Sequence, residues 1–280
     1  MLSDGSISLK PKCYISGMKI ISLGLGVQST TMYLMSSLGH IDRADYAVFA
    51  DPGAEHPETY RLLRFLEKWM VRNSNGIPII TKKKSLYTDL LNQTNSSGQK
   101  FASIPAFTNS EQGGGMLRRQ CTREYKIDVV IKAVRELYGL KPHKRMPMTE
   151  FWLGITLDEI MRMKDSQLPR VTNVYPLIEK RLRRSDCLKW LDSYGFPQPV
   201  KSACFFCPYQ ADSQWKHLKQ RHPDTFKKAI QVDNTIRDSS KKGVREPIFL
   251  HRTRKPLDEV DFESQLDLFD SNCDGGYCGL

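Results

Sequence analysis

Apolar residues recur with two different periods near the start of the chain. Residues 19–24 (KIISLG), 46–51 (YAVFAD) and 77–83 (IPIITKK) are short β-rich runs, whereas 27–39 and 56–73 carry apolar residues at helical spacing. The resulting order of strand, helix, strand, helix and strand predicts a doubly wound α/β fold with a parallel sheet. Ligands of such sheets bind beyond the carboxyl ends of the strands.

The rest of the chain is less uniform. Residues 85–120 are rich in Ser, Asn, Gly and Gln, and a loop of this length inside a domain is usually functional or mobile. Beyond it, the pattern predicts a further strand over 150–155 and helices over 123–140, 184–196 and 212–240, the last broken near Pro223.

Composition and charge narrow the class of protein. The chain has no apolar run of about 18 residues and no signal-peptide pattern at its N-terminus, so we expect a cytoplasmic protein without membrane contact. The net charge of +11 favours a nucleic-acid partner over the alternative of a solvated basic surface around a nucleotide site. Seven cysteines, an odd number without an export signal, favour reduced thiols over disulfides.

A glycine-containing loop joins the first predicted strand to the first predicted helix. It lacks the Gly-Lys-Ser/Thr ending of a Walker loop, and it lacks the third glycine of a dinucleotide fingerprint. A pyrophosphate-binding loop at a helix N-terminus is the third option, with backbone N–H groups facing the phosphates. The candidate nucleotide-binding residues of this loop are Ser22, Gly24, Gly26, Val27, Gln28, Ser29 and Thr30.

Five segments together carry a family resemblance. They are ADPGAEHPET (50–59), CTREYKIDVV (121–130), GITLDEIMRM (154–163), YPLIE (175–179) and CFFCP (204–208). In this order they resemble motifs of the phosphoadenosine phosphosulfate (PAPS) reductase-like family, whose members include ATP pyrophosphatases. The resemblance implies an adenine nucleotide alpha-hydrolase-like fold that binds ATP or PAPS, with Mg²⁺ as the ion that accompanies ATP.

The loop departs from the pyrophosphate loop of ATP pyrophosphatases at three positions. Gly24 replaces the usual serine, Leu25 the second glycine and Gln28 the usual aspartate, which is associated with metal-assisted phosphate binding. Asp51, at the end of the second predicted strand, is a further candidate ligand of the nucleotide or its metal, with a helix N-cap as the alternative. Gly154 is a further candidate nucleotide-binding residue, and Arg162 with Asp158 or Glu159 is expected to contact ribose or phosphate.

The cysteines predict a metal site. Cys204 and Cys207 form a Cys-x-x-Cys-Pro turn, and Cys121 lies 83 residues upstream of Cys204, which resembles the [4Fe–4S] ligand arrangement of adenylyl-sulfate reductases. The first cysteine of the family's adjacent pair is Gln120 here. Another thiol, such as Cys187 or one in the tail, is then the fourth ligand, or one iron stays open to sulfide as in cluster-dependent tRNA thiolases. Zinc and unligated thiols are the alternatives, and the six histidines show no metal-binding spacing.

Candidate catalytic residues lie beside the cysteines and in the tail. Arg123 and Lys126 follow Cys121, and Lys126 lies one helical step beyond Arg123, so we expect both on one face. The tail contains Cys273 and Cys278, and its YCGL end resembles the Glu-Cys-Gly-Leu segment that holds the nucleophilic cysteine of PAPS reductases. A merely disordered terminus is the alternative for the tail.

These expectations define a domain plan and a function. We expect a flexible extension over residues 1–18, a nucleotide-binding α/β domain over 19–200, and a basic helical region with the Cys-x-x-Cys turn and a mobile tail over 201–280. The resemblance favours an ATP pyrophosphatase that transfers sulfur to DNA, rather than tRNA, with a cysteine desulfurase as donor. A PAPS or adenylyl-sulfate reductase, a tRNA thiolase and a non-catalytic nucleic-acid-binding module with a structural metal are the alternatives, and a homo-oligomer is left open.

Overall fold

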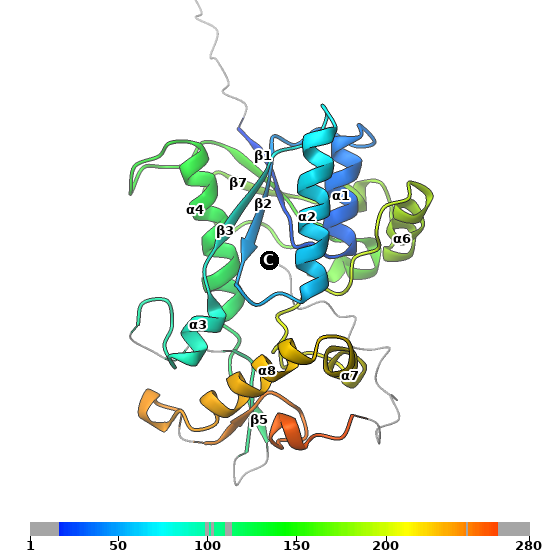
Figure 1. The fold of residues 1–280 in the computed structure, drawn as a ribbon. Coiled ribbons are helices and arrows are strands. Elements are labelled where there is room, and N and C mark those ends of the chain that lie inside the picture. The colour runs from blue at the N-terminus through cyan, green and yellow to red at the C-terminus, as the bar shows by residue number, and fades with distance from the viewer. Residues whose placement is uncertain (1–16, 99–100, 102–103, 110–113, 245, 263–280) are drawn as a thin grey trace, which may run out of the picture.

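The protein consists of a parallel-sheet lobe and a smaller, mainly helical lobe (Figure 1). The computed structural model describes residues 17–98, 101, 104–109, 114–244 and 246–262. The strands of the larger lobe are β1 (Lys19–Ser22), β2 (Tyr46–Asp51), β3 (Ile79–Lys83), β6 (Thr149–Trp152) and β7 (Val171–Val174). They pair in parallel in the order β3-β2-β1-β6-β7. The prediction of a doubly wound α/β sheet is therefore confirmed.

Helices cover both faces of this sheet, because alternate strand residues are apolar on both sides. Ile21 of β1 and Trp152 of β6 pack toward one face, and Ile20 and Phe151 pack toward the other. The elements of the first face are α1 (Val27–Ser37), α2 (Pro57–Arg72) and α6 (Arg184–Ser193), and α4 (Asp128–Leu137) covers the second. This two-sided covering explains why the strands read as nearly continuous apolar runs.

The second lobe combines residues from two separate parts of the chain. Its core joins Leu86 and Ile104 to Phe206, Trp215 and Ile248, all of which are buried. Its elements are α3 (Leu86–Leu91), α7 (Asp212–Arg221), α8 (Pro223–Ile236), the 3₁₀ turns η3 (Ser240–Lys242) and η4 (Leu257–Glu259), and an antiparallel sheet of β5 (Gly115–Met116), β4 (Phe107–Thr108) and β8 (Ile248–Phe249). The predicted break at Pro223 is confirmed, since α7 ends at Arg221 and α8 begins at the proline.

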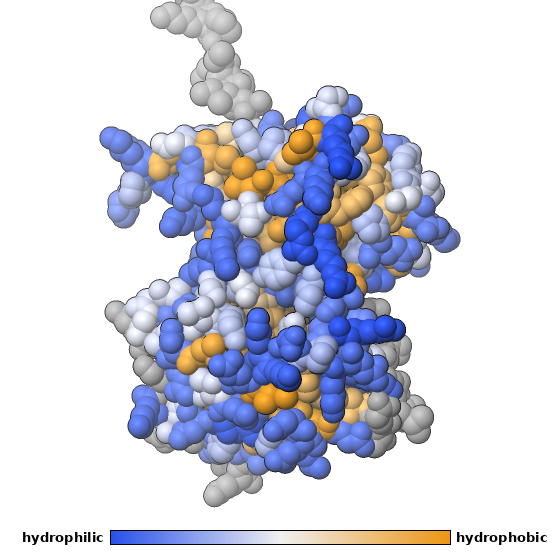
Figure 2. Space-filling view, viewed as in Figure 1, coloured by the Kyte–Doolittle hydropathy of each residue, from blue (hydrophilic) through white to orange (hydrophobic). Residues whose placement is uncertain are grey.

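Three short elements complete the described chain: the π-helix η1 (Arg123–Ile127), the 3₁₀ segment η2 (Leu157–Arg162) and α5 (Pro176–Glu179). Hydrophilic side chains cover most of the face seen in Figure 2, and apolar side chains reach the surface there in separate patches. None of the helices in the described part of the chain combines the length and the apolar character needed to cross a membrane.

Candidate functional site

A pocket of about 170 Å³ lies over the loop between β1 and α1, and we call it the loop pocket. Most of the predicted nucleotide-binding residues line it: Ser22, Gly24, Gly26, Val27, Gln28, Ser29, Gly154 and Arg162. Thr30 does not line the pocket and is fully buried. The pocket thus lies at the carboxyl ends of β1 and β6, where a parallel sheet binds its ligands.

The first turn of α1 is suited to an anion. Gly26 is the N-cap and supplies no side-chain acceptor, and the first turn carries no acidic residue. The first N–H groups of a helix have no intrahelical partner, and the helix dipole adds positive potential there. The cationic side chains that line the pocket, Lys126, Arg162, Arg184 and Lys201, exceed the one carboxylate of its described lining, Glu159.

Gly154 keeps α1 close to the sheet. A Cβ atom at this position would lie 2.7 Å from the backbone nitrogen and 2.8 Å from the Cα atom of Ser29. Such distances are too short for any carbon contact, and backbone atoms cannot rotate away. Glycine is therefore required where β6 leads past the first turn of α1.

Leu25 has a backbone conformation that normally belongs to glycine. Its φ of 58° lies in the left-handed region, and its side chain is buried in the core shared with α1. This is the position where the pyrophosphate loops that the sequence resembles have a glycine. The loop therefore keeps the turn while substituting an apolar side chain, at a backbone cost of about 1–2 kcal/mol.

A short polar chain closes one side of the loop pocket. The Gln28 Nε2 atom lies 3.4 Å from Oε2 of Glu159, whose Oε1 lies 2.8 Å from Nη1 of Arg162. Burial raises the pKa of Glu159, and the Arg162 guanidinium opposes that rise only in part. Glu159 therefore balances some of the positive charge without cancelling it.

Asp51 lies outside the lining of the loop pocket. Its Oδ1 atom accepts hydrogen bonds from the Gly53 backbone N–H at 2.7 Å and from the Tyr60 hydroxyl at 2.6 Å. These bonds shape the turn after β2 and hold the start of α2. The structure thus assigns Asp51 a conformational role in this turn, but not the predicted N-cap role, since the N-cap of α2 is His56.

Lys126 joins the loop pocket to a second cavity. Its Nζ atom lies 2.9 Å from Oε1 of Glu55, whose side chain is fully buried and whose Oε2 accepts a hydrogen bond from the Ser202 hydroxyl at 3.1 Å. Glu55 also forms an isolated antiparallel bridge with Cys204. Sequence reasoning missed Glu55, because its partners lie about 70 and 150 residues away.

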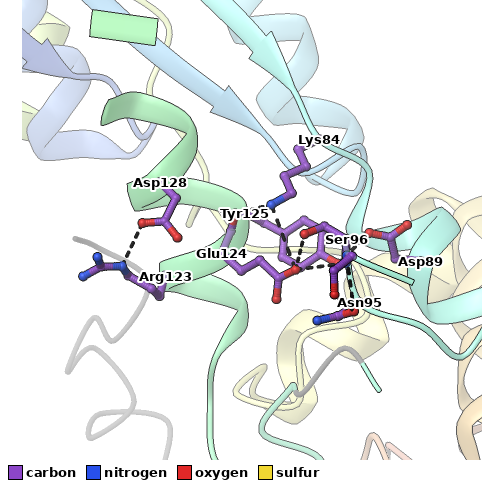
Figure 3. Close-up of polar contacts among 9 residues, drawn as sticks. Lys84, Asp89, Asn95, Ser96, Arg123, Glu124, Tyr125 and Asp128 are labelled. Atoms are coloured by element: carbon purple, nitrogen blue, oxygen red, sulfur yellow. Dashed lines mark hydrogen bonds and ion pairs between the residues drawn. The ribbon is translucent and has the colours of Figure 1, made fainter. Parts of the chain in front are cut away.

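The π-helix η1 separates the two predicted catalytic cations. Arg123 bonds Asp128 on the exposed side at 2.8 Å (Figure 3). Arg123 lines neither cavity, whereas Lys126 lines both. The expectation that the two residues share one face is therefore wrong, because the wider π turn changes the angular spacing of its residues. Tyr125, between them, is anchored by its hydroxyl to Asp89 at 2.6 Å.

The three predicted metal ligands share one small cavity, which we call the cysteine cavity. Cys121, Cys204 and Cys207 line it together with Arg119 and Lys126, and its volume is about 30 Å³. Chain segments more than 80 residues apart thus converge here as the sequence predicts. The Nη1 atom of Arg119 is buried and has no hydrogen-bond partner within the described part of the structure, which suits an anionic group in the cavity.

The donor set fits a thiolate-bound metal centre. Cysteine thiolates bind both iron–sulfur clusters and zinc. A cavity of about 30 Å³ has room for a single ion and is smaller than a four-iron cluster. The loop pocket offers few ligands for Mg²⁺, because Gln28 has an amide in place of a carboxylate and Glu159 is already paired with Arg162.

The remaining cysteines do not complete the set. Cys187 is buried against α1 in the core of the parallel-sheet lobe, and burial raises its pKa to about 12, so the apolar interpretation of this residue is confirmed. Cys273 and Cys278, the predicted sulfur-carrying residues of the tail, lie outside the described residues.

No protein-family model matches the sequence, and a comparison with curated proteins found no match. Function therefore has to be inferred from the residues of the loop pocket and of the cysteine cavity.

Proposed function

We propose that this chain is an ATP pyrophosphatase that acts in sulfur transfer to nucleic acid, similar to the ATP pyrophosphatase subunit of DNA phosphorothioation systems. The observation that carries the proposal is the position of Lys126, which lines both the loop pocket and the cysteine cavity. An enzyme that couples nucleotide cleavage to sulfur chemistry needs these two sites side by side. A cation shared by both can stabilise negative charge that develops between them.

The loop pocket would bind the phosphates of ATP. The N–H groups at the start of α1 and the side chains of Lys126 and Arg162 would hold the phosphate oxygens. An oxygen of the target attacks the α-phosphorus, the bond from that phosphorus to the bridging oxygen breaks, and pyrophosphate leaves toward the helix N-terminus. Mg²⁺ would then be held chiefly by the nucleotide itself, as is common for this ion.

The cysteine cavity would supply the sulfur. Cys121, Cys204 and Cys207 would hold a [4Fe–4S] cluster, which when bound carries or delivers sulfide, and the buried Arg119 nitrogen would donate a hydrogen bond to it. Sulfur attacks the activated atom of the target, and AMP leaves with the target oxygen. A cysteine desulfurase would supply the sulfur as a persulfide, and a thiol reductant would supply the two electrons that release it as sulfide. The net charge of +11 favours DNA or RNA as the target.

The test is pyrophosphate release from ATP by the full chain, purified without oxygen, with nucleic acid and a sulfur donor present. We expect release from the wild-type protein and from Lys132→Ala, an exposed lysine on the outer side of α4, and at least about a tenfold loss in Lys126→Ala. An iron and labile-sulfide assay accompanies it. A colourless, iron-free protein that contains zinc would overturn the sulfide-carrying part of the proposal.

A sulfonucleotide reductase is the second candidate, and Gln28 is the observation that favours it. An amide in place of the loop aspartate weakens the case for metal-assisted ATP cleavage but does not hinder binding of a sulfonucleotide. Sulfite release from PAPS or adenylyl sulfate with thioredoxin, without pyrophosphate release from ATP, would select this candidate.

A further inference from the structure

Three histidines and a glutamate converge where the two lobes meet. His56 and Glu58 lie at the start of α2, His217 lies on α7, and His222 joins α7 to α8. One candidate ligand atom from each residue lies within 4.8 Å of the other three. The prediction that the histidines have no metal-binding pattern missed this group, because the fold brings His56 and Glu58 to His217 and His222 from a distant part of the chain.

The contacts of Glu58 with His217 and His222 are long hydrogen bonds, and their lengths equal the edge of a tetrahedral metal site. Zinc bonds of about 2.0–2.1 Å place neighbouring ligand atoms about 3.3–3.4 Å apart at the corners of a tetrahedron. The Glu58 Oε1 atom lies 3.3 Å from Nε2 of His217 and 3.4 Å from Nε2 of His222, and the Glu58 Oε2 atom lies 3.7 Å from Nδ1 of His56. Hydrogen bonds between such groups are normally shorter, at about 2.7–3.2 Å.

The charges of the four side chains also favour binding of a cation. Three imidazoles face one carboxylate, and the ring centroids of His56 and His222 are only 4.9 Å apart. Protonating every ring would crowd positive charges together, whereas neutral rings direct lone pairs into the same space. A divalent ion accepts those lone pairs and compensates the Glu58 carboxylate at once.

Two of the three histidine side chains are held in place by burial, and the third is open to solvent. The side chains of His56 and His222 are only 11% and 10% exposed, so the packing of the two lobes fixes them. The His217 side chain is 47% exposed, which leaves a route for an ion from solvent. We infer that His56, Glu58, His217 and His222 bind one zinc ion that joins the parallel-sheet lobe to the helical lobe.

Zinc suits this set because imidazole nitrogen and carboxylate oxygen are among its usual ligands. Four protein ligands fill a tetrahedral site, so the ion is structural. The ion would affect the loop pocket and the cysteine cavity only indirectly, by fixing the backbone at His56. His56 directly follows Glu55, the partner of Lys126. The inference does not depend on the proposed function.

The test compares zinc content and thermal stability of the full chain after chelation and reloading with zinc. Wild-type protein and His143→Asn, a substitution at an exposed histidine outside the group, should each bind one more equivalent of zinc than His217→Ala and Glu58→Gln. Zinc should raise the melting temperature of the first two proteins and not that of the variants. His217→Ala is the main variant, because its side chain is the most exposed of the three histidines and its loss should disturb the packing least.

Cobalt distinguishes this site from the cysteine cavity. Thiolate ligands give Co²⁺ an intense charge-transfer band, whereas histidine and carboxylate ligands give only weak visible bands. We expect the weak bands to disappear in His217→Ala and any thiolate band to remain. Equal zinc content in wild type and His217→Ala, or a cobalt spectrum with thiolate bands alone, would overturn the inference.

Discussion

The Nζ atom of Lys126 lies 2.9 Å from Oε1 of Glu55, a carboxylate whose side chain is fully buried. The two residues come from different layers of the parallel-sheet lobe, since Glu55 precedes α2 and Lys126 belongs to η1 beside α4. Lys126 lines both the loop pocket and the cysteine cavity, and its ion pair with Glu55 fixes the position of its side chain. Loss of either partner therefore affects stability as well as both cavities.

Replacing Lys126 should destabilise the protein strongly. Lys126→Ala leaves the Glu55 carboxylate buried without its cation, and breaking a buried pair in this way costs about 3–5 kcal/mol. The double variant Lys126→Ala with Glu55→Gln should recover much of that loss, because the uncompensated charge is removed. Urea unfolding measures the difference, and Lys132→Ala should stay within about 0.5 kcal/mol of wild type. Equal stability of the single and double variants would contradict the expected burial of charge.

Gly154→Ala should disturb the loop pocket and the fold together. The new methyl group would meet the Ser29 backbone at 2.7 Å, so α1 must shift outward. We expect a loss of about 1–3 kcal/mol, the usual cost of overpacking, with weaker nucleotide binding. Gly26→Ala is the matched control, because its Cβ would find its nearest neighbour, in Ser202, at an ordinary 3.9 Å. Thermal unfolding and nucleotide titration of both variants check the prediction, which fails if the two variants behave alike.

His251 should make stability fall in mild acid. Its Nε2 atom lies 2.9 Å from Oδ1 of Asp212, and its Nδ1 accepts from the Thr253 N–H at 3.3 Å, which together indicate a neutral ring with the proton on Nε2. Burial lowers the pKa of His251 and outweighs the Asp212 carboxylate, which favours the charged ring. The unfolded chain therefore binds a proton below about pH 6.5 that the folded chain does not, so stability is lost as pH falls below that value.

The variant His251→Gln tests this dependence. A glutamine side chain does not titrate, so part of the difference in the free energy of unfolding between about pH 7.5 and about pH 5.5 should disappear. Exposed His143 provides the comparison, since His143→Asn should keep the wild-type slope. An unchanged slope in His251→Gln would show that the folded ring takes up a proton as readily as the unfolded one.

Cysteine reactivity should separate the thiols by position. Burial raises the pKa of Cys187 to about 12, so very little reactive thiolate forms near neutral pH. Cys204 and Cys207 are partly exposed at the cysteine cavity. After chelation, iodoacetamide should modify these two in the folded protein and Cys187 only after unfolding, which peptide mass spectrometry detects. Early modification of Cys187 would contradict its placement in the core.

The sequence predicted those helices and strands that are determined by the local pattern of apolar residues and by proline. The alternation that buries Ile20 and Ile21 on opposite faces is visible in the sequence, and so is the break at Pro223. The π turn at Arg123 has no comparable signal, because its backbone hydrogen bonds follow tertiary contacts such as Tyr125 with Asp89. The prediction of a plain helix there consequently misplaced Arg123 relative to Lys126.

The candidate site was predictable only where motifs mark it. Cys121 and Cys204 were paired through the family resemblance, and they do share one cavity. Glu55 lies inside the ADPGAEHPET motif, but the motif does not indicate its partner Lys126, and His217 lies in none of the motifs. Their partners are distant in sequence and are brought near by tertiary packing. Long-range polar pairing of this kind is what a single sequence hides.

The contact between Gly154 and Ser29 has a consequence for protein engineering. Because a glycine more than 120 residues downstream leaves room for the first turn of α1, residues 22–31 do not form a self-sufficient cassette. Grafted onto another parallel sheet, they would keep their shape only if the recipient's neighbouring strand also ended in a glycine at the matching height.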